Sequence, residues 1–136
     1  MVTEKFMYGD IEVFVSLPQR VNIVRSDSGV GKSFLSIVLP QLNMRGFNVV
    51  VVKYDNFKTF DLNCLFRADE KTMVVFDNAD IYMSEELKNA VISSEATCLI
   101  FTRDTRFFNV MNSGICVVSY DGKQLQIREV RCDDYF

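Results

Sequence analysis

Apolar and polar residues alternate along two segments near the N-terminus, "TEKFMY" (3–8) and "IEVFVS" (11–16). A repeat of two residues is typical of β-strands with one buried face, so both segments are predicted strands. Only Gly9 and Asp10 separate them, and a two-residue connector that contains glycine favours a tight hairpin. A second hairpin is predicted near the other end of the chain, from strands 114–120 and 123–130 and the turn residues Asp121 and Gly122.

Continuous apolar runs, rich in β-branched residues, occur at intervals between the two hairpins. Such runs are typical of strands that are buried on both faces of a parallel sheet. Segments with helical spacing separate the runs, and strands that alternate with helices predict parallel βαβ units. The predicted buried strands are "RVNIVR" (20–25), "FNVVVVKYD" (47–55), "TMVVFDNAD" (72–80) and "ATCLIFTRD" (96–104).

Helices are predicted in the segments that join these strands. The first ends at Gly46, a residue that favours the C′ position. Pro40 lies inside this helix and removes a backbone hydrogen bond, so a kink is expected near residues 36–40. A short helix is expected near 60–66, and another begins after Ser84, a good N-cap residue. The apolar positions of the first helix are Phe34, Leu35, Val38, Leu39 and Leu42.

The elements together predict one domain over residues 1–136, a length that is sufficient to bury a sizeable core. We expect an α/β fold with three layers. Its mostly parallel five-stranded sheet carries antiparallel hairpin strands at the N- and C-termini.

Composition and charge narrow the functional classes. The net charge is −3, which disfavours nucleic-acid binding through a broad basic face. No apolar run approaches the ~20 residues that cross a bilayer. The N-terminal stretch "MVTEKFMYGD" lacks the basic start and apolar block of a secretory signal. We therefore expect a cytoplasmic protein that makes no membrane contact.

Histidine is absent from the sequence, which excludes the common zinc ligand sets and every histidine-based acid, base or triad. The four cysteines are widely spaced and form no Cys-x-x-Cys pair. Cys98 and Cys116 lie in apolar runs, so they are expected to be buried, reduced thiols.

A glycine-rich stretch, "SDSGVGKS" (26–33), joins strand 20–25 to the first helix. It agrees with the phosphate-loop pattern G-x-x-x-x-G-K-[ST] at every fixed position except the first. Gly31, together with Gly29, lets backbone N–H groups curl around a phosphate without an obstructing Cβ. Lys32 would reach the β- and γ-phosphates, and the Ser33 hydroxyl would coordinate Mg²⁺. The expected binding residues are Ser26, Asp27, Ser28, Gly29, Val30, Gly31, Lys32, Ser33 and Phe34.

Ser26 stands where the pattern has its first glycine. The donors to phosphate are backbone groups, so serine removes none of them. Its cost is about 1 kcal/mol if its φ is positive, and small otherwise. We interpret Ser26 as a tolerated variant; the alternative interpretation is a chance glycine-rich turn.

A phosphate loop also requires a carboxylate near Mg²⁺, at the end of a neighbouring apolar strand. Asp77 follows four apolar residues and fits that role, although a turn residue that ends a strand would look the same. Asn78 comes next, where many ATPases have a glutamate that orients the attacking water. Asp80 could serve instead, or could be an acid of a turn or first helical turn. Hydrolysis is therefore expected to be slow or absent.

Arg103 follows Thr102 at the end of strand 96–104. An arginine at this point can stabilise the charge on a transferring phosphoryl group, so Arg103 is a candidate γ-phosphate sensor. The alternative is a surface arginine paired with Asp104. The candidate catalytic residues are Lys32, Asp77, Asp80 and Arg103.

With these motifs in order, the chain resembles the P-loop NTPase superfamily, and most closely the core of AAA+ and STAND-type ATPases. "VNIVRSDSGVGKSFL" is similar to their Walker A segment, "MVVFDNAD" to Walker B and "CLIFTRD" to the sensor-1 strand. The resemblance covers about residues 20–120. It implies a P-loop NTPase-like sheet of the ASCE (additional strand, catalytic glutamate) type. In that sheet the strand before Arg103 lies between the loop strand and the Asp77 strand.

The resemblance also implies the ligands. Lys32 and Ser33 would bind the triphosphate and Mg²⁺, Asp77 would hold Mg²⁺ mostly through water, and Arg103 would sense the γ-phosphate. No helical lid domain follows the core, so exposed and fairly weak binding is expected. The sequence lacks the guanine-recognition motif Asn-Lys-x-Asp, which favours ATP.

Three functions remain open at this point. The first is a minimal P-loop protein that binds ATP and hydrolyses it slowly. The second is a degenerate scaffold with a protein partner and no hydrolysis, for which Ser26 and Asn78 are the indication. The third is a small-molecule kinase, which usually carries an arginine-rich lid. A neighbouring copy or another protein could complete the site, with Arg67, Arg103 and Arg106 as candidate donors in trans.

Overall fold

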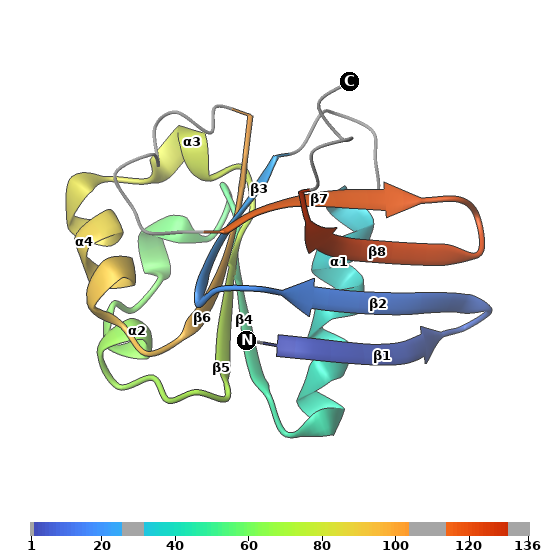
Figure 1. Ribbon diagram of the computed structural model, residues 1–136. Helices are drawn as coiled ribbons and strands as arrows, with labels where there is room; N and C mark the ends of the chain where they lie inside the picture. The colour runs from blue at the N-terminus through green and yellow to red at the C-terminus, as the bar shows by residue number, and fades with distance from the viewer. Residues whose placement is uncertain (1, 26–31, 104–113, 131–136) are drawn as a thin grey trace.

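The computed structural model describes residues 2–25, 32–103 and 114–130, and of residues 32–34 it describes the backbone alone. Within these ranges, eight strands form one hydrogen-bonded sheet in the order β1-β2-β8-β7-β3-β6-β5-β4 (Figure 1). The strands are β1 (Val2–Tyr8), β2 (Ile11–Leu17), β3 (Val21–Arg25), β4 (Asn48–Val52), β5 (Thr72–Phe76), β6 (Thr97–Thr102), β7 (Gly114–Tyr120) and β8 (Gln124–Glu129).

Five neighbouring strands, β7, β3, β6, β5 and β4, are parallel to one another. Every residue of β5 and β6 is buried, as is all of β3 except Arg25. The apolar runs of β3, β5 and β6 are therefore the buried parallel strands that the sequence predicts. The run at 47–55 was wrongly predicted to be buried: β4 is the edge strand, with Asn48 exposed and the three valines 49–51 half-buried. The order also confirms that β6 lies between β3 and β5.

Both predicted hairpins are present. β1 and β2 pair antiparallel through a turn in which Gly9 has a φ of 59°, and β7 and β8 pair antiparallel through a turn in which Gly122 has a φ of 93°. The hairpins also pair with each other, because β2 runs parallel to β8 with Val13 opposite Leu125. This contact joins both ends of the chain into the same sheet.

Short helices connect the parallel strands, and Pro40 lies where the first of them changes type. The helix is α-helical to Val38 and 3-10 helical from Leu39, and it ends at Gly46, which has a φ of 88°. No helix in the described part of the chain combines the length and apolar character needed to cross a membrane. The helices are α1 (Lys32–Val38), η1 (Leu39–Arg45), η2 (Phe57–Thr59), α2 (Asn63–Phe66), α3 (Ala79–Tyr82) and α4 (Glu85–Ser93).

Side chains fix both ends of α4. The Ser84 Oγ accepts a 3.1 Å hydrogen bond from the N–H of Leu87, so Ser84 is the N-cap that the sequence predicts. At the other end of α4, the Arg20 guanidinium donates to the carbonyl of Ile92 in the last turn (2.9 Å) and to that of Ala96 beyond the helix (3.0 Å). These bonds tie the start of β3 to the turn that leads into β6.

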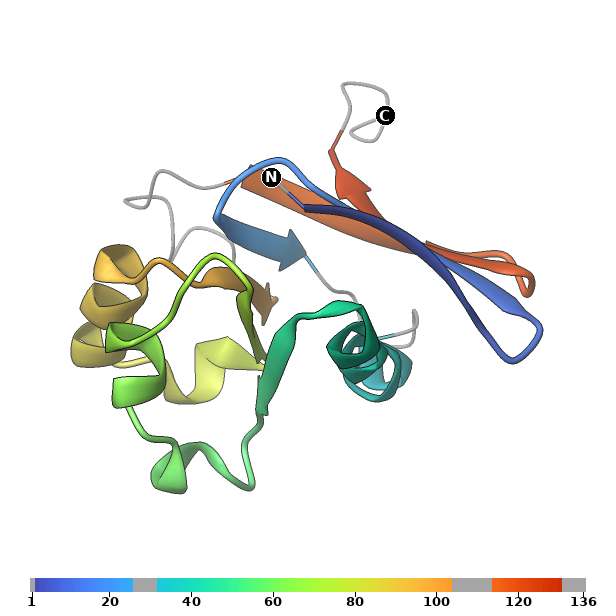
Figure 2. The same ribbon diagram turned by 90° about the horizontal axis from the view of Figure 1, so that it is seen from below.

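The sheet divides the hydrophobic core in two. On one side, α1 and η1 lie inside the curve of the sheet, and Leu35 and Leu42 pack in one cluster with Phe6 of β1 and Val75 of β5 (Figure 2). On the other side, α2, α3 and α4 cover the parallel strands. The curvature arises because both hairpins contribute apolar faces to the cluster around α1 and η1.

The predicted α/β class is confirmed, and the predicted architecture is confirmed in part. The structure is a curled, mixed eight-stranded sheet with few and short helices, so it only partly fits the predicted three-layer fold with a mostly parallel five-stranded sheet and terminal hairpin strands. The segment 72–80 is also shorter as a strand than predicted, because β5 ends at Phe76 and α3 begins at Ala79.

Candidate functional site

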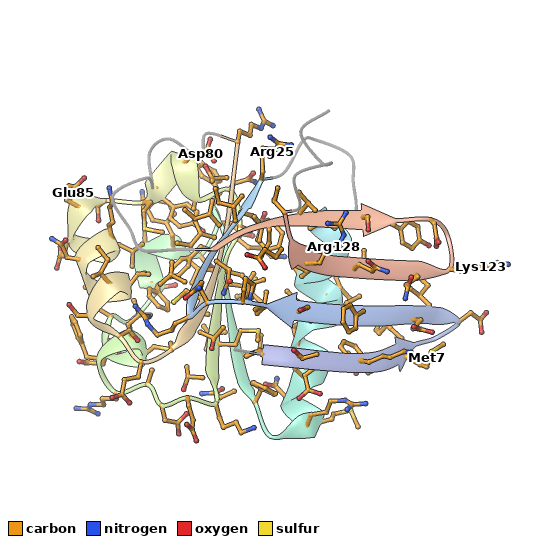
Figure 3. All side chains as sticks on the ribbon, viewed as in Figure 1. Met7, Arg25, Asp80, Glu85, Lys123 and Arg128 are labelled. Carbon is orange, nitrogen blue, oxygen red and sulfur yellow. The ribbon has the colours of Figure 1, made fainter. Side chains whose placement is uncertain are left out.

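The carboxyl ends of β3, β6 and β5 meet at one edge of the sheet. Arg25 at the end of β3 is directly opposite Thr102 at the end of β6, and Phe76 at the end of β5 is opposite Ile100. Figure 3 shows Arg25 and Asp80 at this same end of the molecule. Ligands of open α/β sheets bind in crevices outside the carboxyl ends of the strands, so Asp77, Asp80 and Arg103 lie at the appropriate edge.

The central part of the predicted loop, residues 26–31, lies outside the described residues, and so do the side chains of residues 32–34. The predicted contacts of Ser26, Asp27, Ser28, Gly29, Val30, Gly31, Lys32, Ser33 and Phe34 with phosphate therefore stay predictions. The elements on either side agree with the motif, since β3 ends at Arg25 and α1 begins at Lys32.

Asp77 continues the ladder of β5 by one residue. Its N–H donates a 2.8 Å hydrogen bond to the carbonyl of Val52 in β4. The alternation along β5 places Asp77 on the same face as Met73 and Val75, which pack with Leu35 of α1. Asp77 is half-buried and its Oδ1 atom is buried. Continued by one residue beyond β5, this alternation assigns the carboxylate to the face of the sheet that α1 covers.

Asn78 explains how the chain leaves this edge. Its φ of 53° and ψ of 46° are left-handed, and it has the one positive φ of a non-glycine residue among the described residues. Asparagine is several-fold enriched in this conformation, whereas a glutamate there would be more strained. Asparagine at position 78 is thus matched to the local backbone.

Asp80 is exposed in the first turn of α3. An acid is favourable in a first helical turn, which agrees with the simpler of its two interpretations. The structure gives Asp80 no contact with Asp77 that would mark it as part of a carboxylate pair within the described residues.

Arg103 is exposed immediately after β6, and the preceding Thr102 is fully buried. Arg25 is also exposed, one strand away, and the sequence analysis did not select it as a site residue. The position of Arg25 in the sequence was a usable signal, because it is the last residue of the strand before the predicted phosphate loop. Such a residue lies at the edge of the sheet where the ligand would bind. Two arginines therefore flank the edge on neighbouring strands, which favours an anionic ligand.

Tyr82 is the second residue that the sequence analysis missed. Its hydroxyl lies 2.8 Å from the carbonyl oxygen of Asp77 and 2.9 Å from that of Val52. Burial, followed by the charges of Asp77 and Asp80, raises the pKa of Tyr82, so the hydroxyl keeps its proton. No local pattern could have identified it, because one partner is 30 residues away.

Metal ligands do not cluster in the described part of the chain, where no three His, Cys, Asp or Glu side chains gather around a common point. A Mg²⁺ ion bound with a nucleotide needs fewer, because it keeps several waters and takes one or two carboxylates together with phosphate oxygens. Asp77 is a donor of that kind, and the Ser33 side chain lies outside the described residues.

Two cavities lined by described residues lie away from this edge. One, of about 430 Å³, is at the amino ends of the parallel strands and is bordered by Arg20, Lys71 and Thr97. The other, of about 340 Å³, lies beside β4 and is bordered by Val51 and Phe60. Neither includes Asp77, Asp80 or Arg103, so the chemistry of the site is argued from the strand ends.

No protein-family model, curated protein or solved structure matches the chain. The function therefore has to be argued from the residues and their arrangement.

Proposed function

We propose that the chain binds a nucleoside triphosphate, ATP by preference, together with Mg²⁺, as a minimal P-loop protein. The observation that carries the proposal is the position of Asp77 relative to the glycine-rich stretch. The stretch joins β3 to α1, and Asp77 lies two strands away on the face that α1 covers. A phosphate loop and its magnesium-binding aspartate require this relationship.

The order of the parallel strands supports the same proposal. With β6 between β3 and β5, the order β7-β3-β6-β5-β4 matches what the resemblance to ASCE-type P-loop sheets implies. Arg103 then follows the strand between the loop and Asp77. In this proposal Lys32 and the loop backbone bind the triphosphate, Ser33 and Asp77 hold Mg²⁺, and Arg103 faces the γ-phosphate.

A second candidate is a P-loop scaffold that binds protein partners without hydrolysing nucleotide. The observation that favours it is Asn78, whose left-handed backbone lies where an ATPase would carry its catalytic glutamate. Without that glutamate, no group orients the attacking water for hydrolysis. Nucleotide binding does not need the glutamate. The two candidates therefore differ first in turnover.

Direct titration with a fluorescent ATP analogue tests the proposal. The wild type is expected to bind with Mg²⁺ present, and Lys32→Ala is expected to lose the binding. Lys123→Ala is the matched control, because Lys123 lies at the far tip of the β7–β8 hairpin (Figure 3). Equal affinities of wild type and Lys32→Ala would reject a phosphate loop at this position, and release of phosphate from ATP would reject the non-hydrolysing scaffold.

A further inference from the structure

We infer that Tyr82 is a positioning residue for Asp77, an inference that rests on the proposed function. The Tyr82 hydroxyl lies 2.8 Å from the Asp77 carbonyl oxygen and 2.9 Å from the Val52 carbonyl oxygen. The Asp77 N–H also donates to the Val52 carbonyl, over 2.8 Å. The backbone of Asp77 is thus held on both sides of its Cα, through its N–H and its carbonyl.

The hydroxyl takes the place of a missing strand donor. In a regular parallel ladder, the Asp77 carbonyl would accept from the N–H of Tyr54, two residues after Val52. The chain turns away at Lys53 instead, and the Lys53 N–H donates to the Oδ1 of Asn56 over 2.7 Å. Tyr82 therefore binds the Asp77 carbonyl, while the Val52 carbonyl at the end of β4 accepts from the Asp77 N–H.

The ring of Tyr82 is itself well fixed. It is 9% exposed and stacks on Phe57, with ring centroids 5.0 Å apart and an interplanar angle of 11°. The backbone beside it is held at the end of α3, since the N–H of Met83 donates to the carbonyl of Ala79 over 2.8 Å. The hydroxyl of a buried and stacked ring constrains the carbonyl that it binds.

This constraint matters for Mg²⁺ because functional side chains have to be held within about 0.5 Å of their working geometry. Asn78, which follows Asp77 directly, is left-handed, so the chain leaves the strand conformation immediately after Asp77. Residues that orient a ligand of a metal typically change its affinity 10–100-fold when removed. Loss of the Tyr82 hydroxyl should therefore weaken the Mg²⁺-dependent part of binding and leave the contacts of the loop with phosphate intact.

The experiment compares wild type, Tyr82→Phe and Tyr54→Phe by titration with the fluorescent ATP analogue, in Mg²⁺ and in EDTA. Tyr54→Phe is the matched control, because Tyr54 contacts the same Phe57 ring and is 63% exposed. We expect Tyr82→Phe to weaken binding about tenfold in Mg²⁺ and to leave binding in EDTA unchanged. Equal loss in both conditions, or no loss in either, would overturn the role of Tyr82.

An Asp77→Asn background shows whether Tyr82 acts through Asp77. There, Tyr82→Phe should cause no further loss of affinity in Mg²⁺, and a full additional loss would overturn the inference.

Hydrogen exchange of the protein without nucleotide separates failure of this inference from failure of the proposed function. Tyr82→Phe should accelerate exchange of the Asp77 amide and leave that of Val75 unchanged. If the wild type bound no nucleotide, the proposed function and the magnesium role would both be rejected. Unchanged exchange at Asp77 in a protein that binds nucleotide would reject the positioning by Tyr82 alone.

Discussion

Asp77 lies one residue beyond the end of β5, and its N–H donates a 2.8 Å hydrogen bond to the carbonyl of Val52. This bond carries the ladder between β4 and β5 to the edge where β3 and β6 also end. The backbone of Asp77 is thus held at the edge where β3 ends, two strands away from β3. The predictions below follow from that relationship and from the contacts around it.

Asp77→Asn should remove the effect of Mg²⁺ on nucleotide binding. The amide keeps the shape of the carboxylate and loses its charge, so binding in Mg²⁺ should weaken roughly tenfold while binding in EDTA persists. Calorimetric titration with ATP in the two conditions measures both affinities. Asp80→Asn is the control, and it should leave both affinities unchanged. A loss of Mg²⁺ dependence in Asp80→Asn alone would show that Asp80, and not Asp77, holds the metal.

Replacement of Asn78 should report on its left-handed backbone. Asn78→Ala should destabilise the fold by about 1 kcal/mol, because the Cβ of alanine is strained at a positive φ. Asn78→Gly should be tolerated better, because glycine has no Cβ. Asn78→Glu, which would restore the usual second acid, should be strained like alanine. Urea denaturation gives the free energies of unfolding, and a glycine variant less stable than the alanine variant would contradict the assignment.

Asn56 should keep the edge strand β4 from pairing with other chains. Its side-chain amide accepts from the N–H of Lys53 (2.7 Å) and donates to the carbonyl of Val51 (3.3 Å), so it imitates a neighbouring strand. Asn56→Ala exposes both groups and should cause association that increases with protein concentration. Sedimentation velocity measures the association state, with Asn89→Ala at an exposed position as the control. An Asn56→Ala variant that associates no more than the wild type would argue against this role.

The buried thiols should make the fold sensitive to alkali. Burial raises the pKa of both Cys98 and Cys116 from 9.0 to about 12. A raised pKa in the folded state means that the stability it reflects is complete below pH 9 and is lost as the pH rises toward 12. Urea midpoints at pH 8 and pH 10 should therefore differ more for wild type than for Cys98→Ala/Cys116→Ala. An identical pH dependence of the two proteins would contradict this.

Local patterns predicted the parts of the fold that local chemistry decides. The alternation in β1 and β2, the buried runs of β3, β5 and β6, and the N-cap at Ser84 all appear as expected. The pairing of Val13 with Leu125 could not be predicted, because alternation looks the same whichever strand lies alongside. That pairing joins the two hairpins into the sheet.

The candidate site divides in the same way. Asp77 and Arg103 could be selected because they directly follow apolar strands, and their placement at one edge follows from parallel pairing. Tyr82 could not, since its function depends on Val52, 30 residues earlier in the chain. Asn78 carried a usable signal, because an asparagine just after a strand favours a left-handed turn.

Thermal unfolding with and without millimolar Mg-ATP, in wild type and Lys32→Ala, tests the central claim most directly. A ligand at about 100 times its dissociation constant stabilises the folded state by about 2.7 kcal/mol, which is several degrees for a domain of this size. We expect that shift in wild type and its loss in Lys32→Ala. An unchanged midpoint in wild type, or an equal shift in both proteins, would contradict nucleotide binding by the loop that precedes α1.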